Sequence, residues 1–173
     1  MKVKKYILKE IEDSDINKIH KGLSDPDVTK YYAVHFSTLE ETKEQMEWYS
    51  NLKKSGTGLW WGIYDESDNQ FCGAGGFNDL DKQNKKAEIG LWLYKEYWGK
   101  GILKKVMPQL FEKEFTDLGL NRIEGFVVSD NQKCKTALEK INFTLEETMR
   151  ESEMKDGQKI SVDIYSILKS EWQ

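Results

Sequence analysis

The sequence has 173 residues, and its 26 Lys and Arg against 30 Asp and Glu give a formal net charge of −4. This length suits one domain with its own core, so we expect a single domain over residues 1–173. The acidic balance argues against a nucleic-acid-binding protein, because phosphate binding needs a clustered positive surface. No apolar run approaches the about 18 residues that a membrane span needs. We therefore expect a cytoplasmic protein that binds neither nucleic acid nor membrane.

The few cysteines and histidines do not predict a metal site. Cys72 and Cys134 are far apart in the sequence and form no CxxC pair, so we expect two reduced thiols. His20 and His35 have no Cys, His or Asp around them at the spacing of metal ligands.

The first half of the sequence alternates helix and strand signals. In chain order it predicts a strand at 3–8, a helix from Asp13 or Ser14 to Gly22, a helix at 39–54, and strands at 59–64 and 71–77. Asp25-Pro26-Asp27 should break the first helix. Thr38 followed by Glu41 is a capping-box pattern and marks the start of the second helix.

The second half contains the clearest strand in the chain. It predicts a strand at 87–94, a helix from 102 to about 118 that Gly119 ends, a strand at 123–128, a short helix that starts at Asp130-Asn131, and two strands joined by a turn at Asp156-Gly157. In the strand at 87–94, apolar residues alternate with Glu88, Gly90, Trp92 and Tyr94, so its two faces should differ. Hairpins on both sides of one β–loop–α–β unit indicate an α+β sheet with a local parallel pair.

Two glycines precede the helix at 102. Gly99 and Gly101 allow a tight turn that points several N–H groups at one spot, and the helix start adds the positive end of its dipole. Such a turn can hold a pyrophosphate, or it can be an ordinary glycine-assisted loop. The full G-x-G-x-x-G dinucleotide pattern is absent, since Lys104 stands where the third glycine would be.

Together with the preceding strand, this loop is similar to the acyl-CoA-binding signature of the GNAT N-acetyltransferases. The similar runs are 87–93 and 96–101, and further segments at 118–124, 130–143 and 156–172 follow in the family's order. Their sequence resembles the RimJ/RimL-type branch, which acetylates protein N-termini and other amines. The resemblance implies a mostly antiparallel twisted sheet with one splayed parallel pair, helices on both faces, and acetyl-CoA as cofactor. It also implies a monomer or a homodimer.

The resemblance carries cofactor contacts onto individual residues. It implies that the strand residues offer backbone hydrogen bonds to the pantetheine arm, that the loop residues hold the pyrophosphate, and that Asn131 touches the pantetheine. The strand residues are Leu91, Trp92 and Leu93, and the loop residues are Trp98, Gly99, Lys100, Gly101, Ile102 and Leu103. The sequence departs from the family pattern at Leu103, at Pro108 inside the expected helix, at Cys134, at Leu138 and at Asn142.

Acetyl transfer to an amine needs a neutral amine, a stabilised oxyanion and a protonated thiol leaving group. Glu88 is our candidate for the base, with a purely structural carboxylate as the alternative. Cys134 is our candidate for the acid that protonates the thiolate. The alternative for Cys134 is a buried thiol, because it shares a helical apolar face with Ala137, Leu138 and Ile141. Asn131 is also a natural N-cap for that helix, a role compatible with cofactor contact.

The acceptor site is expected near Trp92, Tyr31 and Tyr32. We predict transfer to a primary amine, either a protein N-terminal α-amine or a small-molecule amine, by direct attack without an acyl-enzyme. Two other functions use the same loop. A non-catalytic CoA-binding or regulatory module would keep the cofactor contacts without the chemistry, and a nucleotide-binding protein would bind ADP or ATP without preferring pantetheine.

Overall fold

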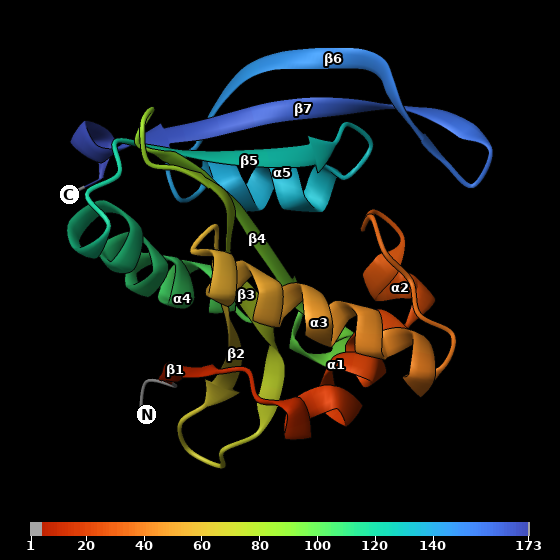
Figure 1. Ribbon diagram of the computed structural model, residues 1–173. Helices are drawn as coiled ribbons and strands as arrows, with labels where there is room; N and C mark the ends of the chain where they lie inside the picture. The colour runs from red at the N-terminus through yellow and green to blue at the C-terminus, as the bar shows by residue number, and fades with distance from the viewer. Residues whose placement is uncertain (1–4, 173) are drawn as a thin grey trace.

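The computed structural model describes residues 5–172. Its strands are β1 (Tyr6–Glu10), β2 (Leu59–Asp65), β3 (Phe71–Asp81), β4 (Lys86–Leu93), β5 (Arg122–Val128), β6 (Thr144–Lys155) and β7 (Gln158–Leu168). They form one seven-stranded sheet in the order β1-β2-β3-β4-β5-β7-β6 (Figure 1). Neighbouring strands are antiparallel, except that β4 and β5 are parallel. The expected mixed sheet with one parallel pair is confirmed, whereas residues 3 and 4 of the expected first strand lie outside the described part.

Helices at 39, 102 and 132 start where the sequence predicts, whereas the start of the first helix needs a correction. They are α1 (Ile16–Leu23), α2 (Pro26–Thr29), α3 (Leu39–Ser55), α4 (Ile102–Phe111), the π-helix η3 (Glu112–Asp117) and α5 (Gln132–Glu139), with 3-10 turns at Asp13–Asp15, Lys95–Tyr97 and Lys169–Glu171. The capping box of α3 is confirmed, since the Glu41 amide donates to Thr38 Oγ1 at 3.1 Å. The prediction that Asp13 or Ser14 caps the first helix is wrong. Those residues form the 3-10 turn, and the Asp15 carboxylate accepts from the Glu12 amide at 2.9 Å.

The helix expected over 102–118 changes its geometry part-way. Pro108 lies inside α4, and one turn later the chain widens into the π-helix, where the Leu118 amide donates to the Lys113 carbonyl at 3.0 Å. Gly119, with φ +64°, then ends the helical segment as the sequence predicts. Phe115 is buried in a hydrophobic core, as its helical spacing from Phe111 predicts.

Two hydrophobic cores lie on opposite faces of the sheet. The first contains Leu110 of α4, Phe115 of η3 and Leu138 of α5. The second contains Ile19 of α1 and Tyr49 of α3. Helices therefore cover both faces, as predicted. No helix in residues 5–172 has the length and apolar character needed to cross a membrane.

Candidate active site

The sheet divides between β4 and β5. The two strands pair only over Lys86–Glu88 of β4 and Arg122–Glu124 of β5, although β4 continues to Leu93. β5 keeps its antiparallel partner β7 over its whole length. In Figure 1 the layer β5-β7-β6 runs across the top of the molecule, while β2, β3 and β4 descend from it. Beyond Glu88 the β5 side of β4 is thus a strand edge that an extended ligand can pair with.

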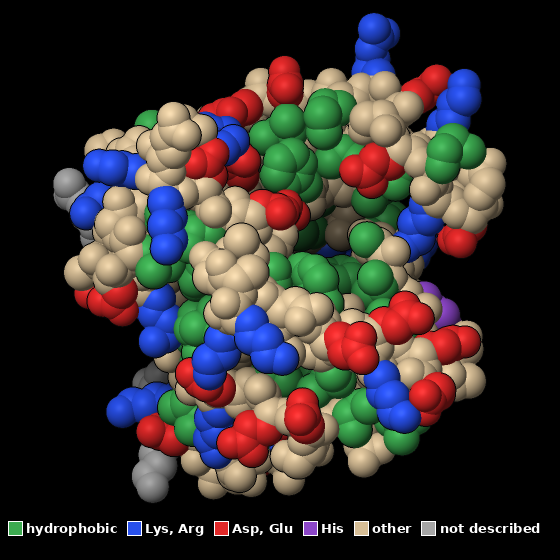
Figure 2. Space-filling view, in the orientation of Figure 1, with side chains coloured by type: hydrophobic (Ala, Val, Ile, Leu, Met, Phe, Trp, Pro, Cys, Tyr) green, Lys and Arg blue, Asp and Glu red, His purple; other side chains and the backbone are tan. Residues whose placement is uncertain are grey.

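The space at this fork is open to the surface. Figure 2 shows a hollow with hydrophobic walls and acidic side chains at its rim, between the β5-β7-β6 layer and helices α2 and α3. The side chains of Leu91 and Leu93 pack against the first core, so these residues present their backbone to the fork.

The loop after β4 leads into the start of α4. Gly99 and Gly101 have φ values of +72° and +69°, a left-handed conformation that favours glycine. No described side chain caps α4, and a Cβ built at either glycine would meet open space. Ile102, 1% exposed, fixes the first turn in the core, and half-buried Leu103 packs against it. The helix start therefore points N–H groups and the positive end of its dipole toward solvent, as an anion site requires.

Trp98 ties this loop to the end of β4. Its indole N–H donates to the Leu93 carbonyl at 3.0 Å, and its backbone N–H donates to the Lys95 carbonyl at 3.1 Å. The backbone N–H of Trp98 is thus already used, which leaves the anion site to the residues after it. Lys100 Nζ lies 5.0 Å from the centre of the Tyr97 ring, so this lysine folds back over the loop.

Glu88 is the last residue of β4 that pairs with β5. Burial raises the pKa of its carboxyl to about 7, together with a hydrogen bond to Asp79 and the negative charge of that residue. A hydrogen bond from Asn78 acts in the opposite direction, and the charge of Glu124 adds a smaller increase. A half-buried carboxyl with a pKa near neutrality can both accept and release a proton under physiological conditions.

Glu124, opposite Glu88 on β5, has a structural environment. Its carboxylate accepts from Arg122 Nε at 2.8 Å and from Lys86 Nζ at 3.1 Å. Burial favours a higher pKa, but these hydrogen bonds outweigh it and lower the pKa of Glu124. Glu124 therefore remains a paired anion, in contrast to Glu88.

Cys134 and Asn131 lie at the start of α5. Asn131 caps this helix as expected, since the Cys134 amide donates to Asn131 Oδ1 at 3.2 Å. The Cys134 thiol is half-buried against the first core, and burial raises its pKa to about 11. At neutral pH it is a protonated thiol, which argues against a nucleophilic role.

Of the three residues expected near the acceptor, Tyr32 lies closest to this chemistry. Burial raises the pKa of Tyr32, and the groups that interact electrostatically with its phenol are Tyr49, Glu88 and Cys134. Both candidate catalytic residues, Glu88 and Cys134, therefore lie close enough to the Tyr32 phenol to influence its pKa. Tyr31 instead lies under Lys30, whose Nζ is 5.1 Å from the ring centre.

The Trp92 indole is buried in the second core. It is 3% exposed and donates to Tyr49 Oη at 3.4 Å. A Cβ built at Gly22 of α1 would lie 2.1 Å from the Trp92 ring, so the ring fills the space that this glycine leaves. An acceptor would reach the Trp92 side chain only after these neighbours moved.

One contact at the site was not foreseen from the sequence. Lys155, at the tip of the β6–β7 hairpin, donates from Nζ to the carbonyls of Thr29 and Tyr32, the former at 2.9 Å. It thereby ties the hairpin to the segment that carries Tyr32. No sequence signal links residues so far apart, since a lysine beside a turn is ordinarily solvated.

Comparison with known proteins decides the family. The acetyltransferase (GNAT) domain family matches residues 5–144. The chain belongs to the GNAT acetyltransferases. It is 32% identical to the uncharacterized N-acetyltransferase p20 of Bacillus licheniformis over 164 residues, which covers 94% of this chain and 91% of p20. It is 35% identical to the putative ribosomal N-acetyltransferase YdaF of Bacillus subtilis over 125 residues, or 72% of this chain and 65% of YdaF.

A solved GNAT structure has the same fold. The spermidine N-acetyltransferase of Vibrio cholerae, in complex with CoA and spermine, superposes with a TM-score of 0.86. The alignment covers 96% of this chain and 97% of that one, at 20% sequence identity. In line with the RimJ/RimL-type resemblance, the relatives of this chain include a putative ribosomal N-acetyltransferase. The chain is an acetyltransferase, and its family uses acetyl-CoA as the cofactor.

The described residues fit that cofactor. β4 beyond Glu88 offers a strand edge to the amide-containing pantetheine arm, and the uncapped start of α4 offers N–H groups to phosphate oxygens. Among residues 5–172 no group of three or more His, Cys, Asp and Glu could hold a metal ion.

Proposed function

We propose that this GNAT acetyltransferase transfers an acetyl group from acetyl-CoA to the α-amino group of a peptide or protein, by direct attack of the amine. The observation that carries the proposal is Glu88, a half-buried carboxyl with a pKa of about 7 at the point where β4 and β5 separate. The ribosomal function suggested for YdaF is in line with an α-amine acceptor.

In this proposal the cofactor lies along β4 with its phosphates at the start of α4. Leu91, Trp92 and Leu93 offer backbone groups to the pantetheine arm, and Asn131 lies where β5 leads into α5. Trp98, Gly99, Lys100, Gly101, Ile102 and Leu103 shape the phosphate site, with most of the N–H groups coming from the residues after Trp98. When bound, acetyl-CoA supplies the acetyl group as an activated thioester.

Glu88 is the proposed base. At pH 7 a carboxyl with a pKa of about 7 is half ionised, so it can take the ammonium proton directly or through water. An α-amine with a pKa of about 8 is then about one-tenth neutral, whereas a lysine-type amine with a pKa of about 10.4 is only about 0.04% neutral. A base of this strength therefore suits an α-amine better than an alkylamine.

Cys134 is a weak match for protonating the leaving thiolate. Its pKa of about 11 exceeds the about 8.5 of an ordinary thiol, so proton transfer from Cys134 would be uphill by roughly 2.5 pKa units or about 3.4 kcal/mol. The proton that Glu88 has accepted is the better matched source. Cys134 would then act as an apolar wall beside Tyr32, with its thiol as a secondary donor.

The acceptor side is assigned to the hollow beneath the β6–β7 hairpin. Tyr32 is the proposed contact for the acceptor backbone, because it lies near Glu88 and its segment is held by Lys155. Trp92 supports that side from the second core, and Tyr31 lies on the same segment. A small polyamine, the ligand named for the Vibrio cholerae structure, is the second candidate acceptor.

Calorimetry with acetyl-CoA, and with ADP as the control ligand, tests the cofactor first. Micromolar acetyl-CoA binding that is clearly tighter than ADP supports the proposal. No binding by folded protein would refute it, and equal binding of both ligands would favour a nucleotide-binding protein.

The acceptor and the base are tested together. Wild type is assayed with short peptides carrying free N-termini, with spermidine and with lysine, and Glu88→Gln is assayed with the best acceptor. We expect peptides to be preferred and Glu88→Gln to lose about 10²- to 10⁴-fold in turnover while its acetyl-CoA affinity is unchanged. Glu147→Gln, at an exposed position of β6, is the matched control. If none of the tested amines is acetylated, a non-catalytic CoA-binding module would be favoured.

A further inference from the structure

β3 contains an irregularity directly opposite Glu88. Asn78 pairs with Glu88, but the next pair joins Asp81 to Lys86, so β3 has two residues where β4 has only Ala87. This is a β-bulge, a feature that redirects side chains and is common beside active sites. Asp79 is one of the two residues opposite Ala87 and has φ +50°, a left-handed conformation that aspartate tolerates better than most residues.

The bulge brings the Asp79 carboxylate to Glu88. Asp79 and Glu88 interact through a hydrogen bond and through their charges. Asn78 Nδ2 donates to Asp79 Oδ2 at 2.9 Å, which orients the carboxylate without neutralising it. A carboxylate beside a second carboxyl group favours the protonated form of that group, so Asp79 raises the pKa of Glu88.

We propose that Asp79 is a positioning residue that acts through Glu88, because the bulge holds its carboxylate where the protonated Glu88 carboxyl donates a hydrogen bond to it. Asp79 orients the Glu88 carboxyl at the fork and strengthens Glu88 as a base. The proposal rests on the proposed function in assigning the role of base to Glu88.

The other groups around Glu88 do not supply the same effect. On β5, Glu124 faces Glu88, but Lys86 and Arg122 bind its carboxylate and offset its charge. From the segment after α2, the Tyr32 phenol stays protonated, because burial raises its pKa. On α5, Cys134 is likewise a protonated thiol near Tyr32. After burial, Asp79 is therefore the largest cause of the raised pKa of Glu88, and its effect exceeds that of Glu124.

The test is a titration of Glu88 itself in Asp79→Asn. Asparagine keeps the size of the side chain and tolerates a positive φ, so the bulge should be preserved. Protein with ¹³C-labelled Glu side chains is titrated by NMR, and Glu88→Gln identifies the Glu88 signal. We expect the Glu88 midpoint to fall by about one pH unit or more in Asp79→Asn, with the acid limb of kcat/KM moving to lower pH by the same amount.

Asp81→Asn is the matched control. Asp81 is the paired residue directly after the bulge, and its carboxylate accepts from the Asn84 amide at 2.8 Å and from Asn84 Nδ2 at 2.7 Å. In Asp81→Asn the titration midpoint of Glu88 should stay at the wild-type value. Asp79→Gly, which also accommodates a positive φ, is a second variant that should lower the midpoint like Asp79→Asn.

A Glu88 midpoint that stays within about 0.3 pH units of wild type in both folded Asp79 variants overturns the pairing. The proposed function fails separately. If Asp79→Asn shifts the midpoint but Glu88→Gln retains wild-type turnover, the pair exists and Glu88 is not the base.

Discussion

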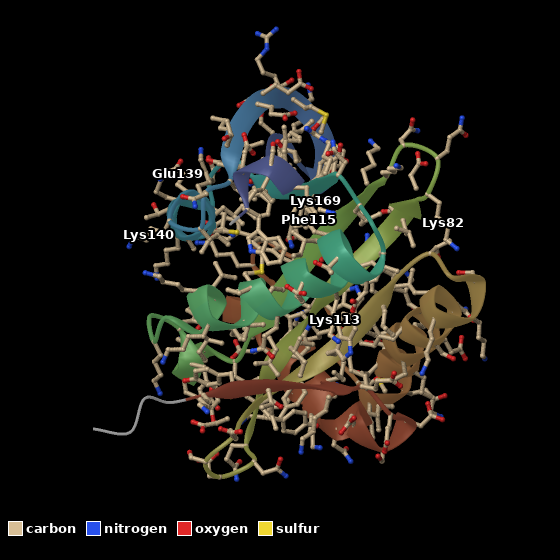
Figure 3. All side chains as sticks on the ribbon, turned by 90° about the vertical axis from the view of Figure 1, so that its left-hand side faces the viewer. Lys82, Lys113, Phe115, Glu139, Lys140 and Lys169 are labelled. Atoms are coloured by element: carbon tan, nitrogen blue, oxygen red, sulfur yellow. The ribbon has the colours of Figure 1, made fainter. Side chains whose placement is uncertain are left out.

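Glu114 offers a sharp test of the energetics of this fold. It lies in the π-helix η3 with an exposed fraction of 0%, and neither carboxylate oxygen has a hydrogen-bond partner among the described residues. Figure 3 shows its neighbours Lys113 and Phe115 on opposite sides of this helix, and the Phe115 ring stacks on Trp172 at a centroid distance of 5.5 Å. Burial raises the pKa of Glu114 well above its usual value, so the folded protein carries it as a neutral acid.

Replacing Glu114 by methionine should stabilise the protein. An unpaired buried polar group costs about 1–3 kcal/mol, and methionine removes it while filling a similar volume. We therefore expect Glu114→Met to raise the free energy of unfolding by about 1–3 kcal/mol near pH 5.

The gain should grow with pH. Glu114 is protonated in the folded chain and ionises in the unfolded chain above its ordinary pKa of about 4.3, so unfolding releases a proton. The wild type therefore loses stability as pH rises, by up to about 1.4 kcal/mol per pH unit from this group, until the folded carboxyl itself ionises. Glu114→Met has no carboxyl group at this position, so the difference in stability between the two proteins widens as the pH rises above about 5.

Urea unfolding of both proteins at several pH values measures this difference. Glu112→Met, at an exposed position in the same π-helix, is the control and should change the stability by no more than about 0.5 kcal/mol. A Glu114→Met protein that is less stable than wild type, or a difference that does not depend on pH, would refute the reasoning.

Two further predictions concern the cofactor and acceptor sides. Gly101→Ala should cost about 1–2 kcal/mol of stability through its positive φ, and should weaken acetyl-CoA binding about tenfold by distorting the anion site. Gly119→Ala has a similar φ at the far end of the helical segment, so it should lose similar stability in a melting assay and keep its affinity in calorimetry. Equal affinity in the two variants would contradict an anion site at Gly101. Lys155→Met should raise KM for the acceptor about fivefold and leave acetyl-CoA binding unchanged, because it frees the segment around Tyr32. Lys159→Met, which removes only a surface ion pair with Glu151, is its control, and the same KM in both variants would argue against the tie.

The features that could be predicted from the sequence are local. Alternation in β4, the capping box at Thr38 and Glu41, and the turn at Asp156-Gly157 are each set by neighbouring residues. The loop with Gly99 and Gly101 was found in the same way, because a tight turn before a helix has its own sequence signature.

The features that could not be predicted depend on residues that only the fold brings together. In the sequence, Asp79 is an aspartate of the kind found in ordinary loops. Only the register of β3 against β4 shows that it lies beside Glu88. Glu114 has helical spacing from buried Leu110 and Phe111, but the sequence does not show that a charged residue type is enclosed there without a partner. The role of Lys155 depends on its hydrogen bonds to the carbonyl groups of Thr29 and Tyr32, which are 126 and 123 residues away in the sequence.

The strand order of the sheet also constrains how the protein can assemble. β1 to β4 pair as successive neighbours in space, so this part can form from contacts within the first half of the chain. In the other part, β7 lies between β5 and β6 and pairs with both. β5 therefore gains its long antiparallel neighbour only after residues 158–168 have been made. The hairpin tie at Lys155 depends on the same late strand, so the acceptor side should be the last region to become ordered as the chain folds.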